Sequence, residues 1–288
     1  MGKYLEYNQK YGGAAMIGTV NTARFSMDYL KFGSGREALV IIPGLGVKSV
    51  MLSAKAVESA YSPFAEEYTV YLFDRRRELP EEYTISDMAE DTYEAMRALG
   101  LRSANIFGAS QGGMIALALA ISHPEAADKL ILGSTTARVT GERFRAFADW
   151  IALAEAGDAE ALLTDFGRRV YPEKIFEASR SFLRELAKGV TDKELARFVK
   201  LTETMEGFDA ADRLREITCP VLCVSSRDDG VFGEGAESEI AEALGGRDGF
   251  ELYFYDGFGH AAYDTAPDYK ARIMAFLKGN AGVKLVSK

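Results

Sequence analysis

The chain has 288 residues, of which 48% are hydrophobic and 27% are charged, and its mean hydropathy is −0.09. These values are typical of a globular protein with a large core, built either as one domain with an insertion or as two small domains. The net charge of −9 argues against nucleic acid and anionic membrane as partners, because phosphates and acidic head groups repel an acidic surface.

The ends of the chain and its cysteines indicate a compartment. Residues 1–10 lack the apolar segment of a signal peptide, no apolar run is long enough for a transmembrane span, and we expect the tail to residue 288 to be frayed. Cys219 and Cys223 are predicted to lie in one strand, about 13 Å apart, which is too far for a disulfide. Two buried thiols indicate a reducing compartment, by default the cytoplasm.

Apolar runs alternate with helical patterns in two parts of the chain. The run at 38–42 has no polar alternation, so it predicts a strand that is covered on both faces. In the first part of the chain we predict one or two antiparallel strands at 14–32, a strand at 38–42, a helix at 50–61, a strand at 68–73 and a helix at 85–99. A strand before Gly108, a helix at 114–121 and a strand at 129–132 follow. The last part is predicted to contain a strand at 219–225, a helix at 235–244, a strand at 250–255 and a helix at 267–277. This order predicts an α/β fold with a mostly parallel sheet and helices on both faces.

Residues 138–215 follow a different pattern. Strand-like runs are missing there, and helix formers dominate at 144–155, 159–170, 175–188 and 192–205. We predict an all-helical cap at 138–215, inserted into a core domain that is made of residues 1–137 and 216–288. Most of the aromatic side chains in this segment are expected to form the core of the cap, and a few to line a ligand cavity.

A basic run, Arg75 to Arg77, follows the predicted strand at 68–73. We expect a solvated loop whose guanidinium groups pair with the glutamates that follow; binding of an anionic substrate group is the alternative. No Cys/His cluster suits zinc, and the glycine-rich stretches lack residues that nucleotide-binding motifs require. No metal or cofactor is therefore predicted.

The most informative motif lies between the strand that ends near Gly108 and the helix at 114–121. Gly108, Ser110 and Gly112 have the spacing G-x-S-x-G of a nucleophile elbow. A serine on such a sharp turn adopts a strained backbone conformation, and neighbours without side chains let the strand and helix approach each other. Ser110 is the candidate nucleophile; the alternative is a structural serine in a glycine-rich turn.

A nucleophilic serine needs a base and an acid. The chain has two histidines: His123 precedes a proline at a helix end, whereas His260 follows a predicted strand in a glycine-rich loop, where parallel sheets gather their ligands. His260 is therefore the candidate base. Asp228 and Asp229 both follow a strand and lie between the serine and His260 in sequence, and Asp256 is a weaker competitor that suits a turn.

An oxyanion hole needs two backbone N–H groups near the nucleophile. The elbow supplies the N–H of Gln111. The loop at 43–46, after the strand at 38–42, contains two glycines that let the backbone direct its donors inward. Leu45 in this loop is the expected second donor.

Together these motifs make the chain similar to the α/β-hydrolase superfamily with a helical cap, over residues 14–278. The resemblance is carried by 43–46, 108–112, Asp229 and His260, with 123–125 and 130–132 as the family's usual sequel to the elbow helix. It implies an eight-stranded sheet, Asp229 as the acid and Leu45 and Gln111 as the oxyanion donors. The chain departs from the family at Pro43, where His is usual, and at Ser226, where Gly is usual, so Asp228 stays an alternative acid.

The resemblance implies a serine hydrolase that acts on a small carboxylic ester, a lactone or a related acyl substrate, through Ser110, His260 and Asp229. Two alternatives keep the same fold. The triad could serve C–C bond hydrolysis or cofactor-free peroxidation, or the protein could bind a small molecule without catalysis. The expected partner is a small-molecule substrate, and the sequence does not specify an oligomeric state.

Overall fold

The computed structural model describes residues 15–279; the predictions for the first residues and for the tail beyond 279 lie outside this range. Its eight strands form one sheet in the order β1-β2-β4-β3-β5-β6-β7-β8. β1 pairs with β2 and β2 with β4 in antiparallel fashion, and the five remaining pairs are parallel. The strands are β1 (Met16–Asn21), β2 (Ser26–Phe32), β3 (Glu37–Ile42), β4 (Tyr68–Arg76), β5 (Ala104–Ala109), β6 (Ala127–Gly133), β7 (Val221–Ser226) and β8 (Phe250–Tyr255). The predicted eight-stranded, mostly parallel sheet is confirmed.

Two apolar clusters cover the two faces of the sheet, and β3 shows why its sequence lacks alternation. Val40 and Ile42 belong to one cluster, Leu39 and Ile41 to the other, and all four are buried. Helices α3 (Ile85–Ala98), α4 (Gln111–Ser122) and α9 (Ser238–Leu244) contribute to the first cluster; α2 (Ala54–Tyr61), α10 (Ala262–Thr265) and α11 (Tyr269–Leu277) contribute to the second. The prediction of helices on both faces is therefore confirmed.

Short 3-10 helices complete the connections between these elements. They are η1 (Val50–Ser53), η2 (Ser62–Phe64), η3 (Pro124–Ala126) and η4 (Ala211–Glu216). Among the residues that the structure describes, no helix is both long and apolar enough to cross a bilayer.

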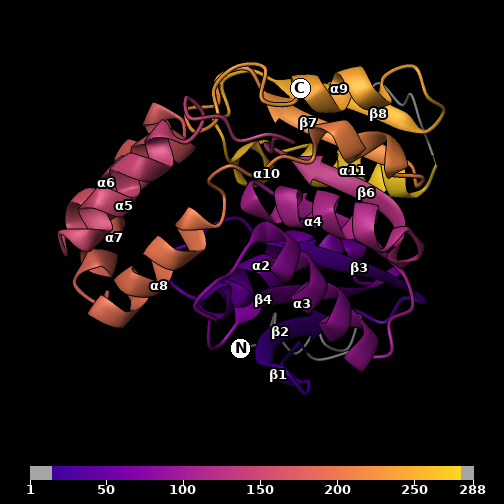
Figure 1. Ribbon diagram of the computed structural model, residues 1–288, viewed down its shortest axis with the longest axis horizontal. Helices are drawn as coiled ribbons and strands as arrows, with labels where there is room; N and C mark the ends of the chain where they lie inside the picture. Colours follow the sequence, from indigo (N-terminus) through magenta and orange to yellow (C-terminus); the bar gives the residue numbers. More distant parts are fainter. Residues whose placement is uncertain (1–14, 280–288) are drawn as a thin grey trace.

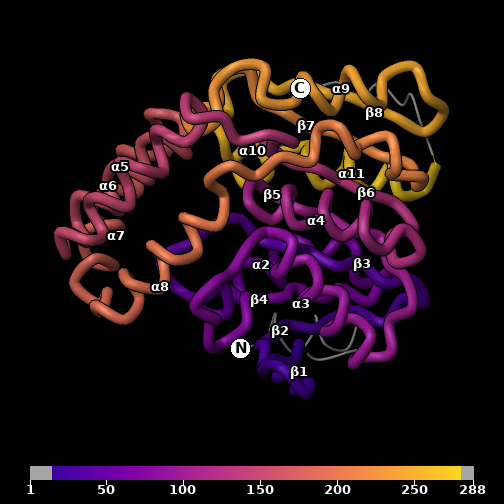
Figure 2. Tube along the Cα trace, viewed as in Figure 1, coloured from indigo at the N-terminus to yellow at the C-terminus, as the bar shows by residue number. Residues whose placement is uncertain are grey.

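Between β6 and β7 the chain forms four helices, which we call the helical insertion. They are α5 (Arg145–Glu155), α6 (Ala159–Val170), α7 (Glu173–Ala187) and α8 (Asp192–Glu203). It lies to one side of the sheet, and Figure 2 shows the chain leaving after β6 and returning before β7 (Figures 1 and 2). Backbone hydrogen bonds join its two ends, from Val139 to Phe208 and from Ala210 to Ala137. The two segments that connect the insertion to the sheet are therefore held side by side.

The structure differs from several of the expected elements, as four examples show. β4 continues through Arg76 instead of ending at Phe73, because its far end pairs with β2, where Met27 lies opposite Arg76. Cys219 precedes β7, so it does not share the strand of Cys223, although both thiols are free and buried. Helix α9 begins at Ser238 instead of residue 235. The short helix α10 was not predicted at all.

Candidate active site

The turn between β5 and α4 holds Ser110 in an unusual backbone conformation. Its φ is 55° and its ψ is −122°, and Ser134 is the other non-glycine residue with positive φ in the described range 15–279. Hydrogen bonds hold this conformation: the Ser110 N–H donates to the Gly133 carbonyl at 2.8 Å, and the Ser110 carbonyl accepts from the Thr135 hydroxyl at 2.8 Å. Such strain, held by its surroundings, is characteristic of functional turns.

The two glycines beside Ser110 are required by close contacts. A β-carbon at Gly108 would lie 2.3 Å from the carbonyl oxygen of Gly112, and one at Gly112 would lie 2.0 Å from the carbonyl oxygen of Ile42. Real β-carbons do not approach backbone oxygens this closely, so β3, β5 and α4 meet only because these side chains are absent. The glycine spacing therefore has a structural cause beyond the turn itself.

The loop at 43–46 passes directly beside the serine. A β-carbon at Gly44 would lie 3.2 Å from the Ser110 Cβ and 3.8 Å from its Oγ. Gln111 begins α4, so its N–H is one of the N-terminal groups that a helix leaves without an intrahelical acceptor. Leu45 lies in the loop and lines the same cavity as Ser110. The structure thus brings together the predicted nucleophile and the two segments predicted to supply oxyanion donors.

A buried histidine–carboxylate pair lies at the ends of β7 and β8. Nδ1 of His260 donates to Oδ2 of Asp229 at 2.8 Å, and both side chains are buried. The other carboxylate oxygen accepts the N–H groups of Val231 at 2.8 Å and Phe232 at 3.0 Å. These bonds fix the carboxylate in one orientation, so it can hold the imidazole with Nδ1 protonated and Nε2 available.

Asp228 faces the same loop but contacts its backbone instead of the imidazole. Its carboxylate accepts the N–H groups of Gly257 at 3.0 Å and Gly259 at 2.9 Å and the hydroxyl of Ser226 at 2.8 Å. These hydrogen bonds contribute to a lowered pKa, against the opposing effect of burial. Asp228 therefore positions the loop that carries His260, whereas Asp256 is exposed and lies 3.4 Å from Arg227.

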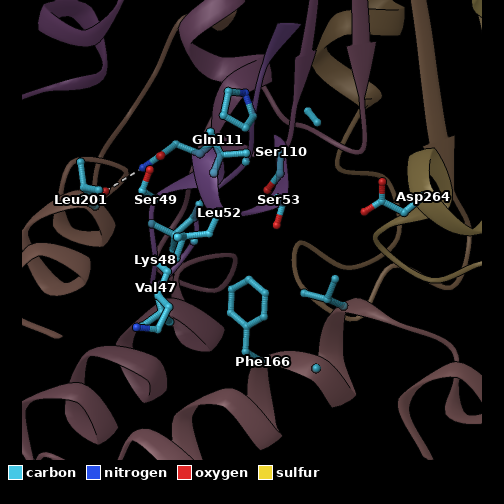
Figure 3. Close-up of a pocket in the computed structure, with 18 of the residues that line it drawn as sticks. Val47, Lys48, Ser49, Leu52, Ser53, Ser110, Gln111, Phe166, Leu201 and Asp264 are labelled. Carbon is cyan, nitrogen blue, oxygen red and sulfur yellow. Dashed lines mark hydrogen bonds between the residues drawn. The ribbon is translucent and has the colours of Figure 1, made fainter. Parts of the chain in front are cut away.

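Ser110 and His260 line one cavity of about 560 Å³ between the sheet and the helical insertion. Figure 3 shows the Ser110 side chain directed into this space, with Phe166 of α6 entering from the opposite side. Most of the wall is apolar, and the insertion supplies a large part of it: Phe147, Trp150, Leu163, Phe166, Val170, Leu183 and Leu186. A cavity of this size suits a small, largely apolar ligand.

Arg75 is the site residue that the sequence reasoning assigned wrongly. It is buried in β4 and donates to the carbonyl of Pro43 at 2.7 Å and to the Gln111 side chain at 3.2 Å. It does not pair with the following glutamates in a solvated loop. Burial lowers its pKa to about 10, against the opposing effect of Asp74. The guanidinium thereby links the 43–46 loop to the elbow, a contact that only the tertiary structure brings about.

Gln111 extends this link to the helical insertion. Its amide donates to the carbonyl of Leu201 at 2.7 Å and to the hydroxyl of Thr204 at 3.3 Å, at the end of α8 (Figure 3). The side chain of the residue after Ser110 thus joins the sheet to the wall of the cavity. Within residues 15–279, no group of three or more His, Cys, Asp or Glu side chains is arranged to hold a metal ion.

Comparison with known proteins places this geometry in a family. Residues 37–267 match the family described as "alpha/beta hydrolase fold". The chain belongs to the α/β-hydrolase-fold family. The match spans both the elbow and the loop that carries His260, and the membership supports hydrolysis as the class of activity.

Curated relatives and solved structures agree with this family. The chain is 28% identical over 259 residues to a protein of Caulobacter sp. (strain K31) named "Putative carbamate hydrolase RutD", covering 86% of this chain and 93% of that protein. A protein of the same name from Agrobacterium fabrum is 30% identical over 69% of this chain and 77% of its own length.

Among solved structures, MGS-M2, described as an alpha/beta hydrolase enzyme from a deep-sea metagenome library, aligns with a TM-score of 0.80 at 21% identity. That alignment covers 91% of this chain and 97% of MGS-M2. The enol-lactonase of Burkholderia xenovorans LB400 aligns with a TM-score of 0.76 at 19% identity, over 91% of this chain and all of that chain. At these identities the structures show a shared fold.

Proposed function

We propose that this protein is a serine hydrolase that cleaves a small carboxylic ester, a lactone or a related acyl compound, with Ser110 as nucleophile, His260 as base and Asp229 as acid. The observation that carries the proposal is that a strained serine lines the same cavity as a histidine that is paired with a buried carboxylate. The proposal assigns the activation of Ser110 to His260 and the orientation of His260 to Asp229, the roles that covalent acyl transfer requires.

The proposed reaction proceeds in two halves. Nε2 of His260 takes the hydroxyl proton of Ser110 while Oγ attacks the substrate carbonyl carbon and forms a tetrahedral oxyanion. Collapse of this intermediate breaks the bond to the leaving group, which receives the proton from His260. Water then attacks the acyl-serine with His260 as base again, and the acid product and the free Ser110 hydroxyl are released.

Charge that develops on the carbonyl oxygen needs donors that are already in place. We assign the N–H groups of Gln111 and Leu45 to this role, each contributing about 2.7–4 kcal/mol in the transition state. The side chain of Gln111 has a separate task, because its hydrogen bonds to Arg75 and α8 fix the start of α4. In this scheme Arg75 positions the 43–46 loop and does not touch the substrate.

The cavity supports the assignment of small acyl compounds as substrates. Its wall is mostly apolar and is closed on one side by the helical insertion, which we propose acts as a cap that excludes bulk water from the reacting bond. Carbamates belong with esters and lactones as acyl candidates, because the curated relatives are named for carbamate hydrolysis. The attacking and leaving steps are the same for each class.

Hydrolysis of p-nitrophenyl acetate and butyrate tests the proposal. We expect wild type to release p-nitrophenol and Ser110→Ala to lose at least about 10³-fold in kcat. Ser53→Ala is the matched control, because Ser53 lines the same cavity from η1 and lies outside the elbow (Figure 3). It should retain activity within threefold.

Labelling with a fluorophosphonate probe gives a second readout. We expect covalent labelling of wild type and Ser53→Ala and none of Ser110→Ala, since the probe reacts with an activated serine. Equal ester hydrolysis by wild type and Ser110→Ala, or absence of labelling in wild type, would contradict the proposal and favour a protein that binds its ligand without catalysis.

A further inference from the structure

The cavity beside Ser110 is lined by six side chains that carry or can carry a charge near neutral pH. Five of them are bonded to protein groups. Among these, Lys48 donates to Gly189 and Glu194, and Arg197 to the carbonyls of Arg76 and Arg77. The six are Lys48, Asp74, Arg75, Arg197, His260 and Asp264.

Of the remaining four side chains, three have protein partners within the described residues and one has none there. Asp74 accepts the hydroxyl of Ser49 and a backbone N–H, and Arg75 and His260 have the partners described above. Asp264 is the sixth, and its carboxylate forms no hydrogen bond or ion pair with any residue between 15 and 279. A carboxylate that can accept several hydrogen bonds thus faces the cavity with all of its acceptor capacity free.

Asp264 lies on α10, four residues after His260, and Figure 3 shows its carboxylate directed into the cavity, on the side where the hydroxyls of Ser110 and Ser53 lie. Asp264 is an exposed residue, and the protein packed around its carboxylate raises its pKa. Lys270 acts in the opposite direction; its ammonium donates to the backbone carbonyl of Tyr263 and lies 5.4 Å from the centre of the Tyr61 ring. A carboxylate that faces a cavity without a protein donor can accept hydrogen bonds from a ligand that supplies the counter-charge.

Three tyrosines line the cavity together with this carboxylate: Tyr61 from α2, Tyr171 after α6 and Tyr263 beside Asp264. Burial raises the pKa of each phenol, and the negative charge of Asp264 raises it further. These rings therefore stay neutral and lie within the electrostatic reach of Asp264. Aromatic rings around a single carboxylate are suited to an ammonium ion, which is attracted by both ring faces and charge.

We propose that Asp264, with Tyr171 and Tyr263, forms a subsite for a protonated amino group of the substrate, next to the acyl group that Ser110 attacks. Because the subsite is defined by its place beside the proposed nucleophile, this inference rests on the proposed function. The cationic side chains of the cavity, Lys48, Arg75 and Arg197, each donate to protein acceptors, so within the described residues Asp264 is the charged group of the wall that has no protein partner. The favoured substrate is therefore an ester or related acyl compound with an apolar body and an ammonium group.

Kinetics with a matched substrate pair test the subsite. p-Nitrophenyl 6-aminohexanoate and p-nitrophenyl heptanoate have acyl chains of equal length and differ in the terminal ammonium. At about pH 8 an alkylamine is protonated and a carboxyl is ionised. We expect wild type to prefer the amino ester by about tenfold in kcat/KM, and Asp264→Asn to bring the ratio close to one, mainly through the amino ester.

Asp74→Asn is the matched control for Asp264→Asn, because it removes a carboxylate from the same wall that already has protein donors. It should leave the substrate ratio unchanged within twofold. An unchanged ratio in Asp264→Asn, or an equal loss in Asp74→Asn, overturns the proposal. So does a wild type that favours the neutral ester.

Thermal unfolding separates a binding role from a structural one. Removing a carboxylate that has no protein partner among the described residues should leave the melting temperature of Asp264→Asn and Asp264→Leu equal to wild type or higher. A lower melting temperature with equal loss of activity toward both esters would assign Asp264 to structure and overturn the subsite.

Calorimetry decides the inference even if hydrolysis fails. Titration of hexylammonium and of 1-hexanol into Ser110→Ala should show at least tenfold tighter binding of the amine, and Ser110→Ala/Asp264→Asn should lose that preference. If wild type neither hydrolyses esters nor reacts with a fluorophosphonate, the proposed function fails. The binding measurement then still tests the subsite independently of hydrolysis. Equal binding of the two ligands overturns the subsite, whatever Ser110 does.

Discussion

The two sides of the cavity are built in different ways. On the sheet side, polar groups are held by short hydrogen bonds to backbone that follows the strands, as with Asp229 and the N–H groups of Val231 and Phe232. On the side of the helical insertion, the lining is mostly apolar, with Phe166 and Leu163 as examples. Under the proposed function, the sheet side fixes the position of the reacting atoms, and the insertion shapes the space that the substrate fills.

Helix α8 carries three of the polar connections between the two sides, and the Val170 carbonyl of α6, which accepts the N–H of Ala261, is another. Gln111 bonds to Leu201 near the end of α8, Lys48 bonds to Glu194 near its start, and Arg197 bonds to the end of β4. The preceding helices α5, α6 and α7 contribute apolar contacts to the cavity. Changes on the sheet side should thus affect chemistry, changes at α8 should affect coupling and stability, and changes on α6 should affect substrate choice.

The largest effect is expected on the sheet side. Asp229→Asn should lower kcat for p-nitrophenyl butyrate by about 10⁴-fold, because an amide neither fixes the imidazole tautomer nor stabilises the imidazolium. Asp228→Asn is the matched control: it weakens the hydrogen bonds to Gly257 and Gly259 but keeps the partner of His260, so a loss below tenfold is expected. Equal losses in steady-state kinetics would contradict the division of roles between the two carboxylates.

An intermediate effect is expected at the connection. Gln111→Met keeps the backbone N–H but removes the bonds to Arg75 and Leu201, so the free energy of unfolding should fall by about 1–3 kcal/mol. Chemical denaturation measures this change. Lys48→Met removes the Glu194 contact, which is partly exposed, and should cost about 0–1 kcal/mol and depend on salt. The comparison fails if the Lys48 variant is the less stable of the two.

The smallest effect on chemistry is expected on the insertion side. Phe166→Ala enlarges the cavity opposite Ser110, so kcat/KM for p-nitrophenyl acetate should change less than threefold while the preference for longer acyl chains shifts. A series of p-nitrophenyl esters from acetate to decanoate measures it. Ile175→Ala, on α7 and exposed, is the control and should leave the chain-length profile as in wild type. A drop in kcat for every ester would mean that the insertion also positions reacting atoms.

The fold was predictable in nearly all its elements because the decisive signals are local. A continuous apolar run such as 38–42 implies burial on two faces, and the glycine spacing at 108–112 implies a turn that only small residues permit. The boundary of β4 was missed because Asp74 to Arg76 are polar, and their strand conformation depends on pairing with β2. The residues that pair with a strand are distant in sequence, so the local sequence of the strand does not indicate them.

The candidate site divides in the same manner. Ser110, His260 and the 43–46 loop could be named from motifs, since each lies at the end of a recognisable strand. Asp229 was favoured over Asp228 by its position, but Asp228 stayed an alternative, because which carboxylate meets the imidazole depends on how the loops after β7 and β8 pack. The same holds for Arg75, whose charge predicted a solvated loop and whose burial comes from contacts with Pro43 and Gln111.

By itself, then, the sequence determined the strand–turn–helix around Ser110, the parallel sheet and the presence of a helical insertion, because backbone conformation and burial periodicity are encoded within a few neighbouring residues. Only the tertiary structure decided the partner of His260, the link from Arg75 through Gln111 to α8, and the unpaired carboxylate of Asp264 in the cavity. Each of these depends on side chains from distant segments, whose meeting is set by the packing of the whole chain.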